Sequence, residues 1–218
     1  MSARVMTVLM ILVLSCTARI SPADEAADVR ESAISFARAL ALGNSEQAKK
    51  FAVNNEMTVS FIELVAPLAS AETKLHDAAL SRFGDKGAAI TNGGTPAEVF
   101  NEKYSKDPAN LQVNITGDTA AITAKPKEGQ KNPSNESLFL KKVDGAWKVD
   151  VAALPGVETM NQKAPQLKAV TRAMSETAEE IQAGKYPDVT KAKVALAQKV
   201  MAALPPSGTA RNASSKAK

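Results

Sequence analysis

The sequence predicts an α+β protein, in which N-terminal helices pack on a curved antiparallel four-stranded sheet and a C-terminal α-helical hairpin follows. Apolar residues recur at helical spacing through residues 24–83, and the period changes to two from Asn110. Helical spacing returns after residue 156. A run of helices followed by a run of strands is typical of an α+β fold with the helices on one face of the sheet.

The chain begins with the pattern of an export signal. Arg4 precedes an uncharged apolar run, Val5 to Leu14, which is too short to cross a bilayer as a helix. The run ends in Val-Leu-Ser-Cys, which resembles a bacterial lipobox, the motif whose cysteine is lipidated and becomes the first residue. We therefore expect residues 1–15 to be a lipoprotein signal peptide and Cys16 to be the lipidation site.

The mature chain would then start with a tether over residues 16–23. The alternative is cleavage by the ordinary signal peptidase after Ala18 or Ala23, which would give a soluble secreted or periplasmic protein. Cys16 is the only cysteine, so no disulfide can form within the chain.

Three helices should precede the connection to the sheet. An amphipathic helix is predicted over residues 24–42 and ends at Gly43, and a short helix over 45–53 follows, with Asn44 as its N-cap. The longest helix is predicted over 56–83. Pro67 should kink or split this helix, because proline removes a backbone donor and clashes with the preceding turn.

The connection to the sheet is predicted to be a loop over residues 85–94 and then a short helix. Thr95-Pro96-Ala97-Glu98 has the spacing of a capping box, with proline at the first helical position. The first two strands should cover 110–116 and 119–125, separated by a turn at Gly117-Asp118. A polar loop over 126–135 then leads to the last hairpin.

The last hairpin is the clearest local signal in the chain. Asp144-Gly145 separates two alternating apolar runs, and both turn positions of such a dipeptide tolerate positive φ. Trp147, Val149 and Val151 fall on one face at period two, so the only tryptophan should anchor the core.

The C-terminal part is predicted to form an αα-hairpin over residues 155–204. Its helices should cover 157–183 and 189–204, with Pro165 interrupting the first and Asp188 capping the second. The apolar stripe expected to be buried on the first helix comprises Leu167, Val170, Met174 and Ile181. Because a two-helix unit has little else to bury against, we expect it to dock in cis. Residues 205–218 have the composition of a disordered tail.

The order of elements resembles that of the nuclear-transport-factor-two-like superfamily, the cone-shaped α+β fold shared with ketosteroid isomerase and scytalone dehydratase. The matching residues are Phe36, Ala37, Leu40, Gly43, Glu46 and Ala48 near the start, and Leu138, Leu140, Asp144, Gly145, Trp147, Lys148 and Val149 at the end. The resemblance covers residues 24–154, which would be the cone domain. It implies a fold and no particular function, since this fold hosts enzymes, binders and adaptors.

One pair of residues is a candidate acid/base site. Glu72 and His76 are spaced i,i+4 within an apolar helix face, so their side chains can meet. In enzymes of the resembled fold a carboxylate or histidine in the cone acts as general acid/base, with its pKa shifted by apolar walls. The alternative is that Pro67 rotates the helix, leaving Glu72 in water and His76 at the rim.

Composition excludes several other function classes. One histidine and one cysteine exclude the usual zinc site, and no glycine-rich phosphate loop is present, so we expect neither metal nor cofactor. Aromatic residues make up 4% of the chain and no basic block occurs, which argues against nucleic-acid binding. Residues 159–218 carry ten Lys and Arg against four Asp and Glu. This excess indicates attraction to an anionic surface or, alternatively, an ordinary solvated helix face.

These observations predict an exported protein, anchored by an N-terminal lipid in the bacterial envelope on the periplasmic face. We expect it to be non-enzymatic and to bind a small apolar ligand or an envelope protein through the cone, with a homodimer as a further option. The alternative is a small lyase, isomerase or hydrolase that uses Glu72 and His76.

Overall fold

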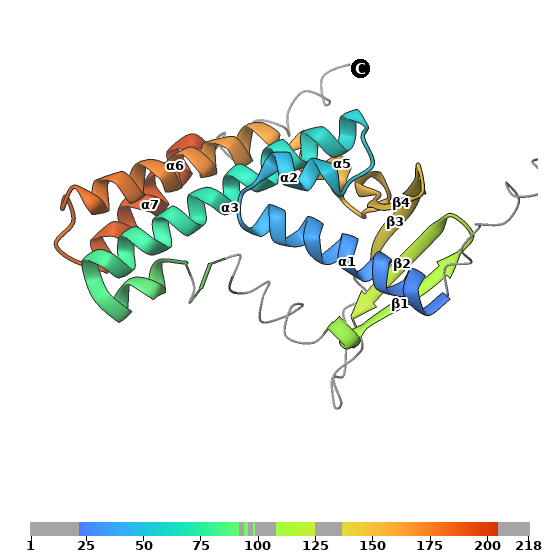
Figure 1. Ribbon diagram of the computed structural model, residues 1–218. Coiled ribbons are helices and arrows are strands. Elements are labelled where there is room, and N and C mark those ends of the chain that lie inside the picture. Colours follow the sequence, from blue (N-terminus) through green and yellow to red (C-terminus); the bar gives the residue numbers. More distant parts are fainter. Residues whose placement is uncertain (1–21, 92–93, 96–97, 99–107, 125–136, 205–218) are drawn as a thin grey trace, which may run out of the picture.

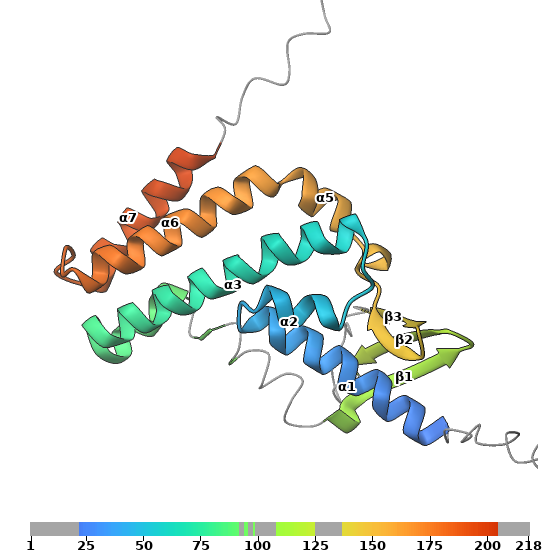
Figure 2. The ribbon, with the colours of Figure 1, turned by 45° about the horizontal axis from the view of Figure 1, so that its top comes forward.

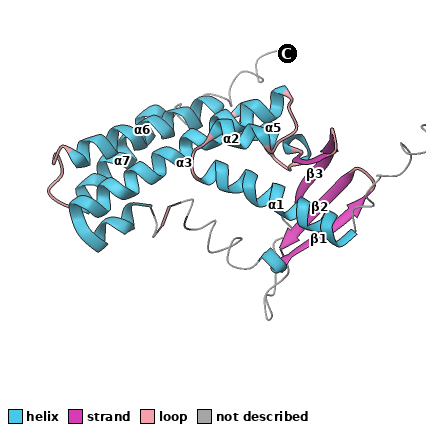
Figure 3. Ribbon diagram, viewed as in Figure 1, coloured by secondary structure: helices cyan, strands magenta, loops and turns pink. Residues whose placement is uncertain are grey.

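The computed structural model describes residues 22–91, 94–95, 98, 108–124 and 137–204. The predicted signal peptide, Cys16 and the predicted C-terminal tail therefore lie outside the described residues. The fold is α+β, as predicted: N-terminal helices pack against a four-stranded antiparallel sheet, and C-terminal helices follow. The strands gather at one end of an elongated molecule, and helices form the other end (Figures 1 and 3).

The first two helices confirm the predicted capping. Helix α1 (Pro22–Ala41) ends before Gly43, whose φ is +70°. A side chain at Gly43 would also clash with helix α3 (Glu56–Phe83), because an added Cβ would lie 2.6 Å from Ser70 Cβ. Helix α2 (Ser45–Lys50) is capped by Asn44, whose Oδ1 accepts the Gln47 N–H at 3.0 Å.

The predicted extension of α2 to residue 53 is wrong. Ala52 instead forms a parallel bridge with Val149 at the edge of the sheet. The Val149 N–H donates to Phe51 O at 2.8 Å, and the Val53 N–H donates to Val149 O at 2.9 Å. The sheet edge offers the backbone of residues 51–53 hydrogen-bond partners far away in sequence, which local periodicity does not reveal.

The sheet has the order β1-β2-β3-β4, with every neighbouring pair antiparallel. Its strands are β1 (Leu111–Thr116), β2 (Thr119–Ala124), β3 (Ser137–Val143) and β4 (Ala146–Val149). The Asp144-Gly145 turn is confirmed, with φ of 52° and 80° at its two central residues. Two positive φ values give the turn the twist that antiparallel strands require. The predicted loop over 126–135 lies outside the described residues.

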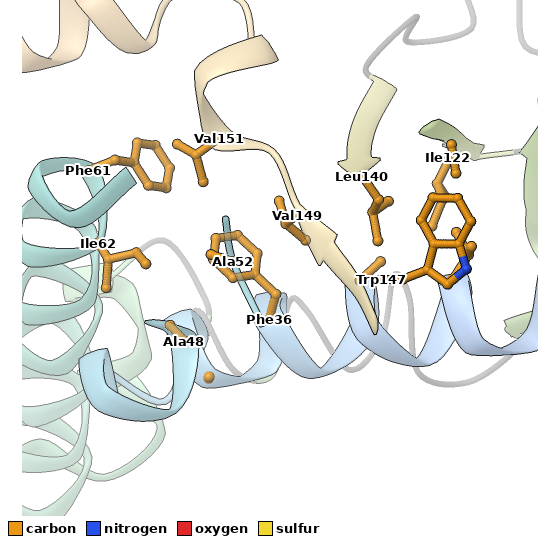
Figure 4. Close-up of a cluster of buried hydrophobic side chains, with 14 of the residues drawn as sticks. Phe36, Ala48, Ala52, Phe61, Ile62, Ile122, Leu140, Trp147, Val149 and Val151 are labelled. Atoms are coloured by element: carbon orange, nitrogen blue, oxygen red, sulfur yellow. The ribbon is translucent and has the colours of Figure 1, made fainter. Parts of the chain in front are cut away.

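The first hydrophobic core lies between the sheet, α1 and the start of the long helix. Trp147 and Val149 are buried on β4, which confirms the predicted strand face for these two residues. Val151 is also buried, but it lies in a 3₁₀ segment, η4 (Val151–Ala153), after the strand. Figure 4 shows this face: Leu140 and Trp147 lie towards α1, Ile122 lies beside Trp147, and Val151 lies towards Phe61. The Lys142 Nζ lies over the Trp147 ring, 5.5 Å from its centroid, and forms an ion pair with Glu25 Oε1 of α1 at 2.7 Å. Side chains therefore fill the space between α1 and the sheet.

The long helix continues beyond this core and supports a second one. Helix α3 (Glu56–Phe83) has the predicted bounds and includes Pro67 without a break in its helical assignment. Its first half contributes Phe61 and Ile62 to the first core, and its second half contributes Leu75, Ala78 and Ala79 to the second. Residues 85–91, predicted as loop, instead belong to a 3₁₀ segment, η1 (Gly84–Thr91), which packs back on α3.

The C-terminal helices dock in cis on the second half of α3. Helices α5 (Val157–Gln162) and α6 (Ala164–Gln182) are separate, as Pro165 predicts, and α7 (Val189–Ala203) is capped by Asp188. Figure 2 shows α6 alongside α3 and α7 alongside α6. The predicted buried stripe of α6 is shifted. Ile181 is buried, but Leu167, Val170 and Met174 are half-buried, and Ala173, Thr177 and Ala178 lie at the contact. Small residues occupy this face because α6 lies close to α3.

Candidate functional site

His76 is enclosed at the second core. Its side chain is 5% exposed, and it lies on α3 between Leu75 and the buried pair Ala78 and Ala79. The imidazole Nδ1 lies 2.6 Å from Thr91 Oγ1 at the end of η1. One ring nitrogen is thus satisfied by a hydroxyl of the same chain, as a buried polar group requires.

The close approach of η1 to α3 creates this hydrogen bond. Gly87 lies against α3 so closely that an added Cβ would be 2.2 Å from Ala79 O. Only glycine leaves room for the two backbones at this distance. The 3₁₀ segment consequently runs back along α3, and Thr91 reaches His76 from 15 residues away in sequence.

A carboxylate lies near the other ring nitrogen. Glu98 Oε2 is 4.0 Å from His76 Nε2 and also accepts the Thr95 N–H at 2.7 Å. Thr95 Oγ1 accepts the Glu98 N–H in return, which confirms the predicted capping box, although the helix it would begin lies outside the described residues. The hydrogen bonds from Thr95 are the main cause that lowers the pKa of Glu98, and His76 adds a smaller effect.

Glu72 lies one helical turn before His76 and is half-buried. Burial raises the pKa of its carboxyl from the usual 4.5, and the nearby imidazole partly opposes this shift. The predicted pair is therefore present on one helix, with different surroundings for its two members. Both lie on the part of α3 that packs with η1 and α6, whereas the sheet packs mainly against α1 and reaches only the first half of α3.

This arrangement places two carboxyl groups near an imidazole, and it fastens η1 to α3 through the hydrogen bond between His76 and Thr91. For catalysis the Thr91 hydroxyl or the imidazole would have to reach a substrate, and both are at least nine-tenths buried. Sequence analysis found Glu72 and His76 but missed Thr91 and Glu98. The capping box was visible, yet its position beside His76 depends on η1 folding back, for which Gly87 was the only local signal.

Two surface hollows lie elsewhere on the described part of the chain. A groove of about 510 Å³ follows α1 and is lined by Ala27, Arg30, Glu31, Ile34, Ser35 and Arg38, with Pro108 beside them. A shallower hollow of about 260 Å³ lies over the strands, where its lining includes Thr116, Thr119, Phe139, Lys141 and Asp150. Neither contains Glu72 or His76.

Comparison of the chain with family models, with curated proteins and with solved structures found no match. The superfamily resemblance thus stays a prediction from the order of elements. Within the described residues no group of three or more His, Cys, Asp and Glu side chains could hold a metal ion. No helix of this part of the chain is long and apolar enough to cross a membrane.

Proposed function

We propose that this chain is an exported, lipid-anchored protein of the bacterial envelope that binds a partner protein and catalyses no reaction. The predicted export signal and the lipobox-like junction at Cys16 support the location in the envelope. The groove along α1 is the observation that carries the binding assignment. A small apolar ligand is less favoured, because packed side chains fill the space between α1 and the sheet.

The groove combines charge with an apolar centre. Arg30, Ile34 and Arg38 are spaced i, i+4 and i+8, so they form one column along the helix. Arg30 is held in place by Leu111 O, which accepts its Nε–H at 3.0 Å. Eight residues of helix span about 12 Å. We therefore expect a partner segment whose two carboxylates, about that far apart, bracket an apolar side chain.

Photo-crosslinking in cells tests the groove. A photoreactive residue in place of Ser35 should give one discrete crosslinked product, and Arg38→Glu should abolish it. Arg82→Glu reverses an exposed arginine at the far end of α3 and serves as the matched control. A product that persists in Arg38→Glu would contradict the groove as the binding site. A product of twice the chain's mass would contradict a different partner protein and would indicate the homodimer.

Labelling with palmitate tests the anchor separately. The protein expressed in a bacterium should incorporate the label, and Cys16→Ala should not. Label retained by the Cys16→Ala variant would contradict the anchor and leave the groove assignment unaffected.

Catalysis by Glu72 and His76 is the second candidate, favoured by the raised pKa of the Glu72 carboxyl, a common property of general acids. Complementation of a deletion strain separates the two candidates. Binding predicts that Glu72→Gln complements as well as the unaltered protein. Failure to complement at an unchanged protein level, with a melting temperature no lower than that of the unaltered protein, would favour the enzyme.

A further inference from the structure

An apolar stripe runs along the outer face of α7. Val194, Met201 and Leu204 are 49%, 72% and 39% exposed, and the exposed Ala197 lies between the first two. The steps of three and four residues keep Val194, Ala197 and Met201 on one face of α7, and Leu204 is the C-cap residue that directly follows the helix. The other face carries Ala192 and Leu196, which pack in the second core. Helix α7 is therefore apolar on two sides, and the described residues cover only one of them.

Positive charge accompanies the stripe. Lys191 and Lys193 are exposed at its N-terminal end, whereas Lys199 is engaged by Glu180 at 2.7 Å and Glu176 at 3.6 Å. From Val189 to the last residue the sequence has six Lys and Arg and no Asp or Glu. Three of these six follow α7, at positions 211, 216 and 218. Charge complementarity requires a negatively charged occupant.

The spacing of the charges favours a surface over a protein partner. A second copy of α7 packed in parallel would bring Lys191 and Lys193 towards the same lysines, which is unfavourable. A copy packed antiparallel would offer these lysines no acidic partner, because the sequence has no Asp or Glu from Val189 onward. An acidic helix would need carboxylates at fixed positions, but half of the basic residues lie beyond the helix end and occur singly. A sheet of anionic headgroups offers charge at every position, and apolar side chains can enter the boundary between headgroups and acyl chains.

We propose that the exposed face of α7 binds an anionic lipid surface, with Val194, Met201 and Leu204 inserted and Lys191 and Lys193 against the headgroups. This surface is distinct from the α1 groove, and it acts whether or not Cys16 carries lipid. Joined to an N-terminal anchor, even a weak contact of this kind would be occupied, because tethering raises its effective concentration.

Vesicle sedimentation tests the proposal with residues 17–218, a chain that keeps every described contact. Phosphatidylcholine vesicles containing about one-third phosphatidylglycerol should bind the protein roughly tenfold more tightly than vesicles of phosphatidylcholine alone. Added salt should weaken this binding. The double variant Val194→Asp, Met201→Asp should abolish this binding, and circular dichroism should confirm that the double variant remains folded.

Matched variants distinguish vesicle binding by the stripe from nonspecific hydrophobic binding and from binding by positive charge elsewhere. Leu42→Asp alters another exposed apolar residue, 63% accessible after α1, and should leave binding unchanged. Lys191→Gln with Lys193→Gln should weaken binding severalfold, while Lys163→Gln with Lys168→Gln, both exposed, should not.

Three results would overturn the proposal. The first is equal binding by the stripe variant, and the second is equal loss of binding in the Leu42→Asp control. The third is absence of vesicle binding. A stripe-dependent dimer in sedimentation equilibrium, or stripe-dependent binding of an acidic amphipathic peptide, would then identify the occupant of the stripe.

Discussion

At the scale of single residues, Trp147 joins the sheet to α1. It is 4% exposed, and its indole Nε1 has no hydrogen-bond partner among the described residues, so its contribution comes from packing and from Lys142 over its ring. Trp147→Ala should lower the free energy of unfolding by about 3–5 kcal/mol. Urea unfolding measures this, with the exposed Lys50→Ala as control. Equal midpoints for the two variants would contradict a central role for the indole.

His76 depends on Thr91 as its hydrogen-bond partner. Thr91→Val keeps the shape but leaves a buried ring nitrogen unpaired, so we expect a loss of about 1–3 kcal/mol in the free energy of unfolding. The control is Thr73→Val, because the Thr73 hydroxyl bonds only within its own helix. A loss no larger than that of the control would mean that the His76–Thr91 bond contributes little.

Glu72 should make stability depend on pH in a direction opposite to that of most carboxylates. Because burial raises its folded pKa above 4.5, the folded state holds the proton more tightly. The charged form is then penalised in the folded state, and stability falls as pH rises through and above 4.5. Glu72→Gln should raise the melting temperature at pH 7. It should leave the melting temperature nearly unchanged at a pH well below 4.5, the usual pKa of the carboxyl group. A loss of stability at neutral pH would indicate a favourable partner for the carboxylate.

At the scale of elements, local rules predicted most boundaries. Caps and glycines gave α3 its observed ends, and Pro165 separated α5 from α6. The failures share one cause. Residues 51–53 and 85–91 take their conformations from partners distant in sequence: Val149 for the first segment, and α3 for the second. Periodicity within a segment carries no information about such partners.

The link between α6 and α7 offers a test by pH. Glu180 accepts hydrogen bonds from Lys199, Tyr186 and Lys185, which lower its pKa to about 2. Burial and, to a lesser degree, the hydrogen bond to Glu180 raise the pKa of Tyr186 to about 12. A lowered folded pKa stabilises the protein above the unfolded value of 4.5, and this contribution disappears as pH falls towards 2.

We therefore expect Glu180→Gln to cost about 1 kcal/mol or less at pH 7, the range of exposed ion pairs. The cost should shrink on acidification. Glu176→Gln, whose carboxylate is half-exposed and lies 3.6 Å from Lys199, should cost less. Melting temperatures of both variants at neutral and acid pH measure this; a cost for Glu180→Gln that does not change with pH would contradict the assigned ion pairs.

At the scale of the whole molecule, one helix supports two cores. The sequence predicted the αα-hairpin and its docking in cis, and the structure places it along the second half of α3. The sequence could not predict the candidate site in full, because His76, Thr91 and Glu98 meet only where η1 folds back over the second half of α3. Sequence patterns identified the residue types and missed their juxtaposition.

Removal of the C-terminal helices should therefore weaken the remaining protein. Truncation after Gly156 would expose Leu75, Ala78 and Ala79, which are buried against α6 and α7. We expect the intact chain to unfold in one transition and the truncated chain to melt at a lower temperature. Differential scanning calorimetry checks both. An unchanged melting temperature with unchanged amide protection would mean that the helical pair adds nothing to the stability of the rest.

The bridge between Ala52 and Val149 has a consequence for the order of events during synthesis and for the proposed export. Strand pairing at this edge joins residues almost a hundred positions apart, so a chain emerging from the ribosome cannot close it until the last hairpin is made. Until then the apolar side chains of α1 and α2 have no sheet to cover them. A nascent chain with this connectivity stays open for most of its translation, the condition that a translocation channel for unfolded polypeptides requires.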